Sequence, residues 1–213
     1  MRPLFITATG TNVGKTYTTL QLIEILSAHG IRVGVYKPIE TGVTTHAPDA
    51  TALLHAVQRH NPTFGSLTPS DITAYTFPLP AAPFCADTTQ CIEVERLLAK
   101  ADQLSQLCDL LLIEGAGGLM VPITQTFTMI DLAQALDAHL LLVTPSRLGC
   151  INDTLLSLTL LQSRHLSYEW CVNLHEDHTT FAQVTQPYYD KAFPVWWSLQ
   201  EGLEEFCQNL IEK

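Results

Sequence analysis

The stretch from Leu4 to Thr16 constrains the fold of this chain more than any other part of it. It starts with an apolar run, continues through small and polar residues, and ends in Gly-Lys-Thr where a helical pattern begins. A strand, a glycine-containing loop and a helix in this order form a phosphate-binding loop, whose backbone N–H groups surround the phosphates. The lysine reaches the terminal phosphates, the following hydroxyl binds Mg²⁺, and the helix N-terminus adds further N–H groups. The stretch therefore predicts a nucleotide site.

The loop departs from the strict pattern G-x-x-x-x-G-K-[ST], because Thr9 stands where the pattern has its first glycine. A Gly-Lys-Thr tripeptide can also open a helix that binds nothing, but here it lies between a strand and a helix, as phosphate binding requires. We expect Gly10 to supply a backbone position with positive φ near the missing glycine. The residues expected at the nucleotide are Thr11, Asn12, Val13, Gly14, Lys15 and Thr16.

Composition narrows the possible partners. The chain has 213 residues, of which 46% are hydrophobic and 15% charged, so we expect a single globular domain over residues 1–213. A formal net charge of −10 argues against nucleic acid or an anionic membrane surface as a partner. No apolar run approaches the roughly 20 residues of a membrane span, and the first strand begins too early for a signal peptide. Six cysteines without a C-x-x-C pair predict free thiols in a reducing cytoplasm.

Short apolar runs alternate with amphipathic segments along the chain. After the strand that begins at Leu4, we expect strands at 31–36, 109–113, 139–144, 170–174 and, weakly, 193–197. The expected helices are one closed by His29-Gly30, one from Pro48, and others over 92–107, 131–136, from the 145–152 segment to His165, and over 199–211. This alternation predicts an α/β fold of the P-loop NTPase type, doubly wound, with a mostly parallel sheet and helices on both faces.

Polar residues follow two of these strands. The loop Lys37–Gly42 comes directly after the second strand, at the sheet edge where ligands of parallel α/β proteins gather. Glu114 ends the apolar strand 109–113, where an acid beside a phosphate loop would make a second contact to Mg²⁺, as in a Walker B strand. A structural turn would explain the glycines after Glu114 but not the glutamate, so we favour a functional role.

Residues 61–91 contain five prolines and predict a loop-rich excursion with one short helix. Two interpretations stay open: surface decoration, or a wall of the substrate site. Trp196 and Trp197, near the C-terminus, are expected to be packing residues.

Four stretches together resemble the dethiobiotin synthetase family: Thr9–Thr16, Lys37–Gly42, Glu114–Gly118 and Leu148–Asn152. They occur in the family's order and at similar spacing, and the resemblance covers about residues 4–175. The family closes the ureido ring of dethiobiotin from 7,8-diaminopelargonate, CO₂ and ATP, with Mg²⁺. The resemblance implies an ATP-dependent cyclo-ligase of biotin biosynthesis that acts as a homodimer.

The resemblance also implies a role for each matching residue. Lys15 would lie on the β- and γ-phosphates, and Lys37 would reach the γ-phosphate and the carbamate, as catalytic lysines. The implied Mg²⁺ ligands are Thr16, Asp49 and Glu114. Besides the loop residues, the implied nucleotide contacts are Glu114, Gly117 and Asn173. The implied substrate contacts are Thr41, Gly117, Gly118, Leu148, Gly149, Cys150, Ile151 and Asn152, the last five through the partner subunit.

The sequence departs from the family in several places. The family often has Gly at Ala8 and Asp at Gly10. Beyond Asn173 the resemblance fades, and no base-binding stretch of the Gly-Glu-Ile-Pro type follows near Pro194. Two alternatives therefore stay open for the nucleotide: ATP alone, or several triphosphates.

Two other P-loop classes compete with this interpretation. An amide ligase of the cobyrinate type needs a fused glutaminase domain, for which 213 residues leave no room. Partitioning and septum-site switch ATPases carry an additional lysine early in the loop, and positions 8–13 of this chain hold none. We therefore place the synthetase first and a nucleotide-dependent switch of the partitioning type second.

Overall fold

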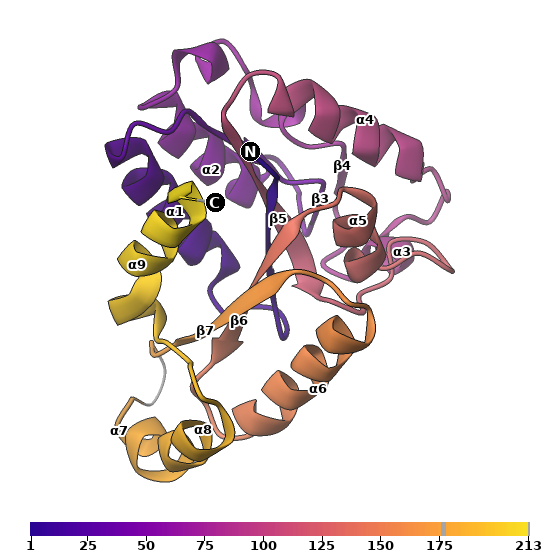
Figure 1. Cartoon of the computed structure of the whole chain (residues 1–213). Coiled ribbons are helices and arrows are strands. Elements are labelled where there is room, and N and C mark those ends of the chain that lie inside the picture. The colour runs from indigo at the N-terminus through magenta and orange to yellow at the C-terminus, as the bar shows by residue number, and fades with distance from the viewer. Residues whose placement is uncertain (176–177, 213) are drawn as a thin grey trace.

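A five-stranded parallel sheet lies at the centre of the computed structural model, which describes residues 1–175 and 178–212 (Figure 1). The strand order is β2-β5-β1-β6-β7. These strands are β1 (Leu4–Ala8), β2 (Val33–Tyr36), β5 (Leu110–Gly118), β6 (His139–Pro145) and β7 (Tyr168–Asn173). All five residues of β1 are buried, because neighbouring strands and helices cover both of its faces, and this explains its continuous apolar sequence.

Helices cover both faces of this sheet, as the alternating pattern predicted. One face carries α1 (Lys15–Ala28), α2 (Pro48–Gln58) and α9 (Leu199–Glu212). The other face carries α4 (Val94–Ser105), α5 (Met129–Ala135) and α6 (Cys150–Ser163), as Figure 1 shows. The chain leaves β1 in one direction to reach β2 and later crosses in the opposite direction to β6 and β7. Right-handed crossovers in opposite directions place their helices on opposite faces, so the doubly wound architecture is confirmed.

A second, two-stranded parallel sheet corrects the expectation that residues 37–42 form only a loop. It consists of β3 (Ile39–Thr41) and β4 (Tyr75–Phe77). The 61–91 excursion returns to supply β4, so β3 has a partner that its own short sequence does not reveal. The rest of this excursion holds two 3₁₀ turns and a helix: η1 (Pro62–Phe64), η2 (Pro69–Asp71) and α3 (Pro83–Ala86). It is therefore more ordered than the single short helix that we expected.

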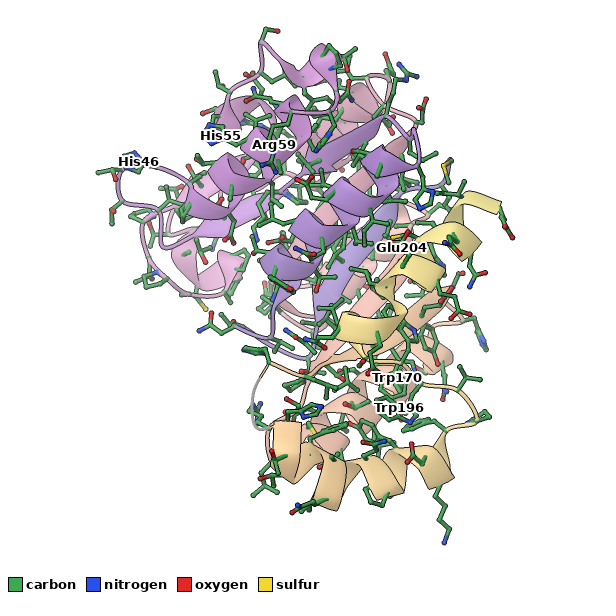
Figure 2. All side chains as sticks on the ribbon, turned by 90° about the vertical axis from the view of Figure 1, so that its left-hand side faces the viewer. His46, His55, Arg59, Trp170, Trp196 and Glu204 are labelled. Carbon is green, nitrogen blue, oxygen red and sulfur yellow. The ribbon has the colours of Figure 1, made fainter. Side chains whose placement is uncertain are left out.

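The C-terminal region contains three helical elements before residues 193–197, where a weak strand was expected. These are α7 (His178–Thr180), η3 (Phe181–Thr185, a π-helical turn) and α8 (Gln186–Ala192). Within the described part of the chain, residues 193–197 form no strand; the backbone of Trp197 only accepts one hydrogen bond, from Val172 N–H. Trp170 and Trp196, labelled in Figure 2, both pack edge-on against Tyr189. Aromatic contacts, together with a single β-bridge between Val172 and Ser198, therefore hold this segment, and Trp196 acts as a packing residue.

The hydrophobic core is one connected cluster that includes residues from Leu4 to Leu210. The remaining predicted helices and strands form close to their expected bounds, except that β5 continues past residue 113 to Gly118. All six cysteines are free. Within the described residues, no helix is both long enough and apolar enough to span a membrane.

Candidate active site

The predicted phosphate-binding loop connects β1 to α1 at the carboxyl end of the sheet (Figure 1). Two residues of this loop have a left-handed backbone, Asn12 with φ 61° and Gly14 with φ 107°. The expectation that Gly10 supplies the positive φ was wrong, because the chain turns later in the loop. A Cβ on Gly14 would lie 2.3 Å from Nδ2 of Asn173, so the end of β7 fixes glycine at this position.

Glu114 lies inside β5 rather than at its tip, since β5 pairs with β1 through Ile6 opposite Glu114. Its side chain is fully buried, and its carboxylate accepts hydrogen bonds from three side chains. Oε1 accepts from Lys37 Nζ at 2.6 Å and from Thr16 Oγ1 at 2.9 Å, and Oε2 accepts from Thr19 Oγ1 at 3.0 Å. The acid is therefore held rigidly against the phosphate-binding loop, as a Walker B acid would be.

Lys37 follows β2 and joins the two predicted acidic ligands. Its Nζ lies 2.6 Å from Oε1 of Glu114 and 2.9 Å from Oδ2 of Asp49, the second residue of α2. Burial alone would lower the pKa of the Lys37 ammonium, but the two carboxylates outweigh burial and raise it above its usual value. Lys37 is therefore a permanent cation at neutral pH.

Lys15, the first residue of α1, folds back over the loop, and its Nζ donates to the Gly10 carbonyl at 2.8 Å. Burial, and next the nearby charge of Lys37, lower the pKa of Lys15 to about 8. Two cations thus face the same region, and a polyanionic ligand would relieve their repulsion.

A cavity of about 650 Å³ opens beside these groups. The predicted site residues that line it are Thr11, Asn12, Gly14, Lys15, Thr16, Lys37, Thr41, Asp49 and Gly117. Pro80, Ala81, Ala82 and Pro83 also line it, which favours the interpretation of the proline-rich excursion as a wall of this cavity. The structure therefore brings residues from five separate parts of the chain to one hollow.

The side chains present suit a magnesium ion. Thr16, Asp49 and Glu114 offer only oxygen atoms, which Mg²⁺ prefers, and both acids contact the same Lys37 ammonium. No group of three or more His, Cys, Asp and Glu side chains suited to a metal occurs in the described residues. Beside a nucleotide, Mg²⁺ usually has a few protein oxygens as ligands, and phosphate oxygens and water complete its coordination.

Several predicted residues lie elsewhere. Val13, Glu114, Gly118 and Asn173 are not among the cavity's described lining, although Glu114 contacts Thr16 and Lys37, which do line it. Asn173 is buried and donates from Nδ2 to the Val13 carbonyl at 3.0 Å, while its Oδ1 accepts from Gln200 at 2.9 Å. In this structure, Asn173 therefore ties the phosphate-binding loop to β7 and α9.

The segment 148–152 also lies away from this cavity of its own chain. Gly149, with φ 92°, precedes the first residue of α6, and Leu148 is 81% exposed. The Cys150 N–H donates to the Arg147 carbonyl at 3.1 Å, so this N–H already has an acceptor within its own chain. Within one chain, this segment therefore does not contribute to the cavity.

Two buried polar residues near the cavity were missed in the sequence. Thr19 lies one helical turn beyond the Gly-Lys-Thr motif, and this spacing could have shown that its hydroxyl faces the same side. Glu40 lies within the stretch Lys37–Gly42 and lines the cavity, but it had been given no role. Burial raises the pKa of the Glu40 carboxyl above its usual value, although hydrogen bonds from backbone N–H groups oppose this shift.

Comparison with known proteins identifies the family. Residues 2–172 match the family described as "AAA domain". Over 210 residues the chain is 62% identical to the ATP-dependent dethiobiotin synthetase of Sulfurovum sp. (strain NBC37-1), which covers 99% of this chain and 100% of that protein. The chain belongs to the dethiobiotin synthetase family. A second dethiobiotin synthetase, from Wolinella succinogenes, is 41% identical and covers 99% of each chain.

Solved structures show how widely the fold of this dethiobiotin synthetase family member is shared. A plasmid partition protein from Borrelia burgdorferi superposes with a TM-score of 0.59 at 10% identity, covering 100% of this chain and 97% of that one. A ParA family ATPase from Chlorobium tepidum gives 0.55 at 16% identity, covering 95% and 89%. At these identities the likeness shows a P-loop NTPase fold and nothing about activity.

Proposed function

We propose that this chain catalyses the ATP-dependent closure of dethiobiotin from 7,8-diaminopelargonate and CO₂. The observation that carries the proposal is the position of Lys37, which lies beside the cavity between the carboxylates of Asp49 and Glu114. A lysine held there, opposite Lys15 of the phosphate-binding loop, can meet both a terminal phosphate and a second anion. The family membership supports the same reaction.

The chemistry needs positive charge more than it needs a nucleophilic side chain. One substrate amine adds to CO₂ and loses a proton, giving a carbamate whose oxygen attacks the γ-phosphorus of ATP while ADP leaves. The second amine then attacks the carbonyl carbon of this carbamic-phosphoric anhydride, which closes the ring and releases phosphate. Lys15 would neutralise the β- and γ-phosphates, and Lys37 would neutralise the γ-phosphate and the carbamate. Positioning of the three reactants would supply the remaining part of the rate enhancement.

The other site residues take roles that follow from their positions. Thr16, Asp49 and Glu114 would hold Mg²⁺, which when bound supplies further positive charge to the phosphate oxygens. Thr41 and Gly117 line the same cavity as the two lysines, which supports a place for them at the diamine. The loop from Thr11 to Gly14 would surround the phosphates with backbone N–H groups.

Phosphate release tests the proposal directly. With ATP, Mg²⁺ and bicarbonate, release should depend on added 7,8-diaminopelargonate, and the Lys37→Ala variant should lose at least about a hundredfold in rate. Lys191→Ala, which changes an exposed lysine on α8, is the matched control and should keep the wild-type rate. Release that ignores the diamine would overturn the proposal and favour a switch ATPase of the partitioning type. The same assay with GTP and CTP distinguishes a site for ATP alone from one that accepts several triphosphates.

We also propose that two copies of the chain form the working enzyme. The segment 148–152 lies outside its own cavity, and α6 presents Leu155 and Leu156 with 36% and 64% exposure. A second copy seated on these exposed leucines of α6 would bring the segment 148–152 to the neighbouring cavity. Sedimentation velocity should give twice the monomer mass, and Leu156→Asp should yield monomers with little activity. A fully active monomer would contradict this assembly.

Two further proposals concern the domain organisation and the location of the protein. We propose one domain over residues 1–213, supported by the single connected core. We propose a cytoplasmic location, supported by the six free thiols, which persist in a reducing compartment. Limited proteolysis and cell fractionation check these two statements.

A further inference from the structure

Glu40 is a buried carboxylate of the cavity wall that the proposed chemistry does not use. It is 3% exposed and lies in the middle of β3, between Ile39 and Thr41. Its two oxygens point to the start of α2 rather than to a cation: Oε1 accepts from the Asp49 N–H at 2.8 Å, and Oε2 accepts from the Ala50 N–H at 2.9 Å. A strand residue therefore contacts both of these N–H groups at once.

These two N–H groups are the ones that α2 cannot satisfy within the helix. Ala47, at the N-cap position, has only a methyl group and makes no capping bond, and Pro48 has no N–H. The next N–H, that of Thr51, already donates to the Ala47 carbonyl at 2.9 Å. Glu40 thus completes the first turn of α2, which a local cap would complete in most helices.

The same contact fixes Asp49 in space. Its backbone N–H is held by Glu40, and its carboxylate is held by Lys37 Nζ at 2.9 Å. The Asp49 side chain is 39% exposed, so without these two contacts it would be free to leave the site. β3 itself is anchored, because Glu40 pairs in register with Thr76 of β4 and the Val43 N–H donates to the Phe77 carbonyl.

We infer that Glu40 is a positioning residue that ties α2 to β3 and so holds the Asp49 carboxylate at Lys37 and at the proposed metal site. The identity of the metal site rests on the proposed function. The link between α2 and β3 rests only on the two hydrogen bonds that Glu40 accepts. Both carboxylate oxygens of Glu40 accept from N–H groups of α2, so Glu40 would act through Asp49. Since β4 leads into the 80–83 wall of the cavity, the tie also joins that wall to the metal site.

A variant with a cap inside α2 distinguishes a positioning role of Glu40 from simple stabilisation of the helix. Glu40→Ala removes both acceptors, and Ala47→Ser in that background places a hydroxyl where it can accept from the same N–H groups without joining α2 to β3. Two properties are measured: the melting temperature, and the affinity for Mn²⁺ in the presence of a non-hydrolysable ATP analogue, by electron paramagnetic resonance. Glu93→Ala is the control, because Glu93 precedes α4 without capping it.

The expected results differ between the two properties. Glu40→Ala should lower the melting temperature and weaken Mn²⁺ binding by about 10- to 100-fold. The double variant should recover the melting temperature but not the Mn²⁺ affinity, and Glu93→Ala should match the wild type in both. Recovery of both properties by Ala47→Ser would overturn the inference and leave Glu40 as a helix cap only. So would a Glu40→Ala protein that binds Mn²⁺ as the wild type does.

One further variant guards against misfolding. Glu40→Gln keeps the side-chain volume and one acceptor oxygen, so it should destabilise the fold less than Glu40→Ala does. Weaker Mn²⁺ binding by this variant would support the inference, and unchanged binding would overturn it. Neither measurement needs the diamine. A wild-type protein without diamine-dependent phosphate release would therefore contradict the proposed function and leave the result for Glu40 intact.

Discussion

Lys37 Nζ lies 2.6 Å from Oε1 of Glu114, whose side chain has no exposure to solvent. A buried carboxylate this close to an ammonium depends on that partner, because the low dielectric around it makes an unpaired charge costly. The same ammonium contacts Asp49, so one cation pairs with both acids proposed to bind metal and offsets part of their negative charge.

Lys37→Met should therefore reduce stability as well as activity. Removing one partner of a buried ion pair costs about 3–5 kcal/mol of unfolding free energy. Mg²⁺ should raise the melting temperature of this variant more than that of the wild type, because the ion replaces the missing positive charge between the acids. Thermal unfolding with Mg²⁺ or with a chelator checks this, with Lys191→Met as the surface control. Equal Mg²⁺ shifts in variant and wild type would contradict the explanation.

Thr19→Val tests whether the second oxygen of Glu114 must be held. The single hydroxyl hydrogen of Thr19 is shared between Glu114 Oε2 and the Lys15 carbonyl, and the residue is fully buried. Loss of the hydroxyl should lower unfolding free energy by about 1–3 kcal/mol and turnover by about 10- to 100-fold. Thr18→Val is the matched variant, because the Thr18 hydroxyl donates to the Gly14 carbonyl, at 2.9 Å, and not to Glu114. If both variants lose turnover equally, the contact to Glu114 has no special importance.

The pKa of Lys15, lowered to about 8 by burial and by Lys37, predicts how nucleotide binding depends on pH. Above pH 8 the free protein loses this charge, and a bound triphosphate favours the protonated form, so binding takes up a proton. Affinity should fall by up to about tenfold per pH unit above 8. Calorimetric titration in buffers of different ionisation enthalpy measures the uptake. An affinity that stays constant to pH 9.5 would contradict the lowered pKa.

The lowered pKa of Lys15 also makes the unfolding free energy depend on pH. Between pH 8 and the usual pKa of 10.5, the unfolded chain holds a proton that native Lys15 has lost. Lys15 therefore makes the unfolding free energy rise with pH in this window, and below pH 8 its contribution is constant. Denaturant unfolding of wild type and Lys15→Met over this range isolates the contribution as the difference between the two slopes.

Gly14→Ala should be damaging, whereas Gly10→Ala should be tolerated by the free protein. Gly14 combines φ 107° with the contact to Asn173, where a Cβ would lie 2.3 Å from Nδ2. The strained backbone alone costs about 1–3 kcal/mol, and displacement of Asn173 adds to it. A Cβ on Gly10 meets nothing within 4 Å. Melting temperatures of the two variants test the contrast, and similar losses in both would contradict it.

Much of the site was predictable because phosphate binding requires particular residue types close together in the sequence. Gly14, Lys15 and Thr16 are adjacent in the chain, and their strand–loop–helix setting is visible in the order of apolar and polar residues. Lys37 and Glu114 were predictable for a related reason: each ends or follows an apolar run, and parallel strands bring such ends to one edge. Residue type and spacing therefore predicted Lys15, Thr16 and Lys37 at the cavity, but not Glu40.

What only the tertiary structure decided depends on contacts between distant segments. β3 has three residues and no periodicity of its own, and its partner β4 lies across the whole of α2 and two 3₁₀ turns. The capping of α2 by Glu40 could not be predicted, because the usual signal for a cap lies one residue before the helix, where this chain has Ala47. The sequence by itself determined the phosphate loop, the alternation of elements and the class of chemistry, since these follow from residue type and spacing. Tertiary structure decided which acids share Lys37 and which wall closes the cavity, because those are fixed by packing between segments far apart along the chain.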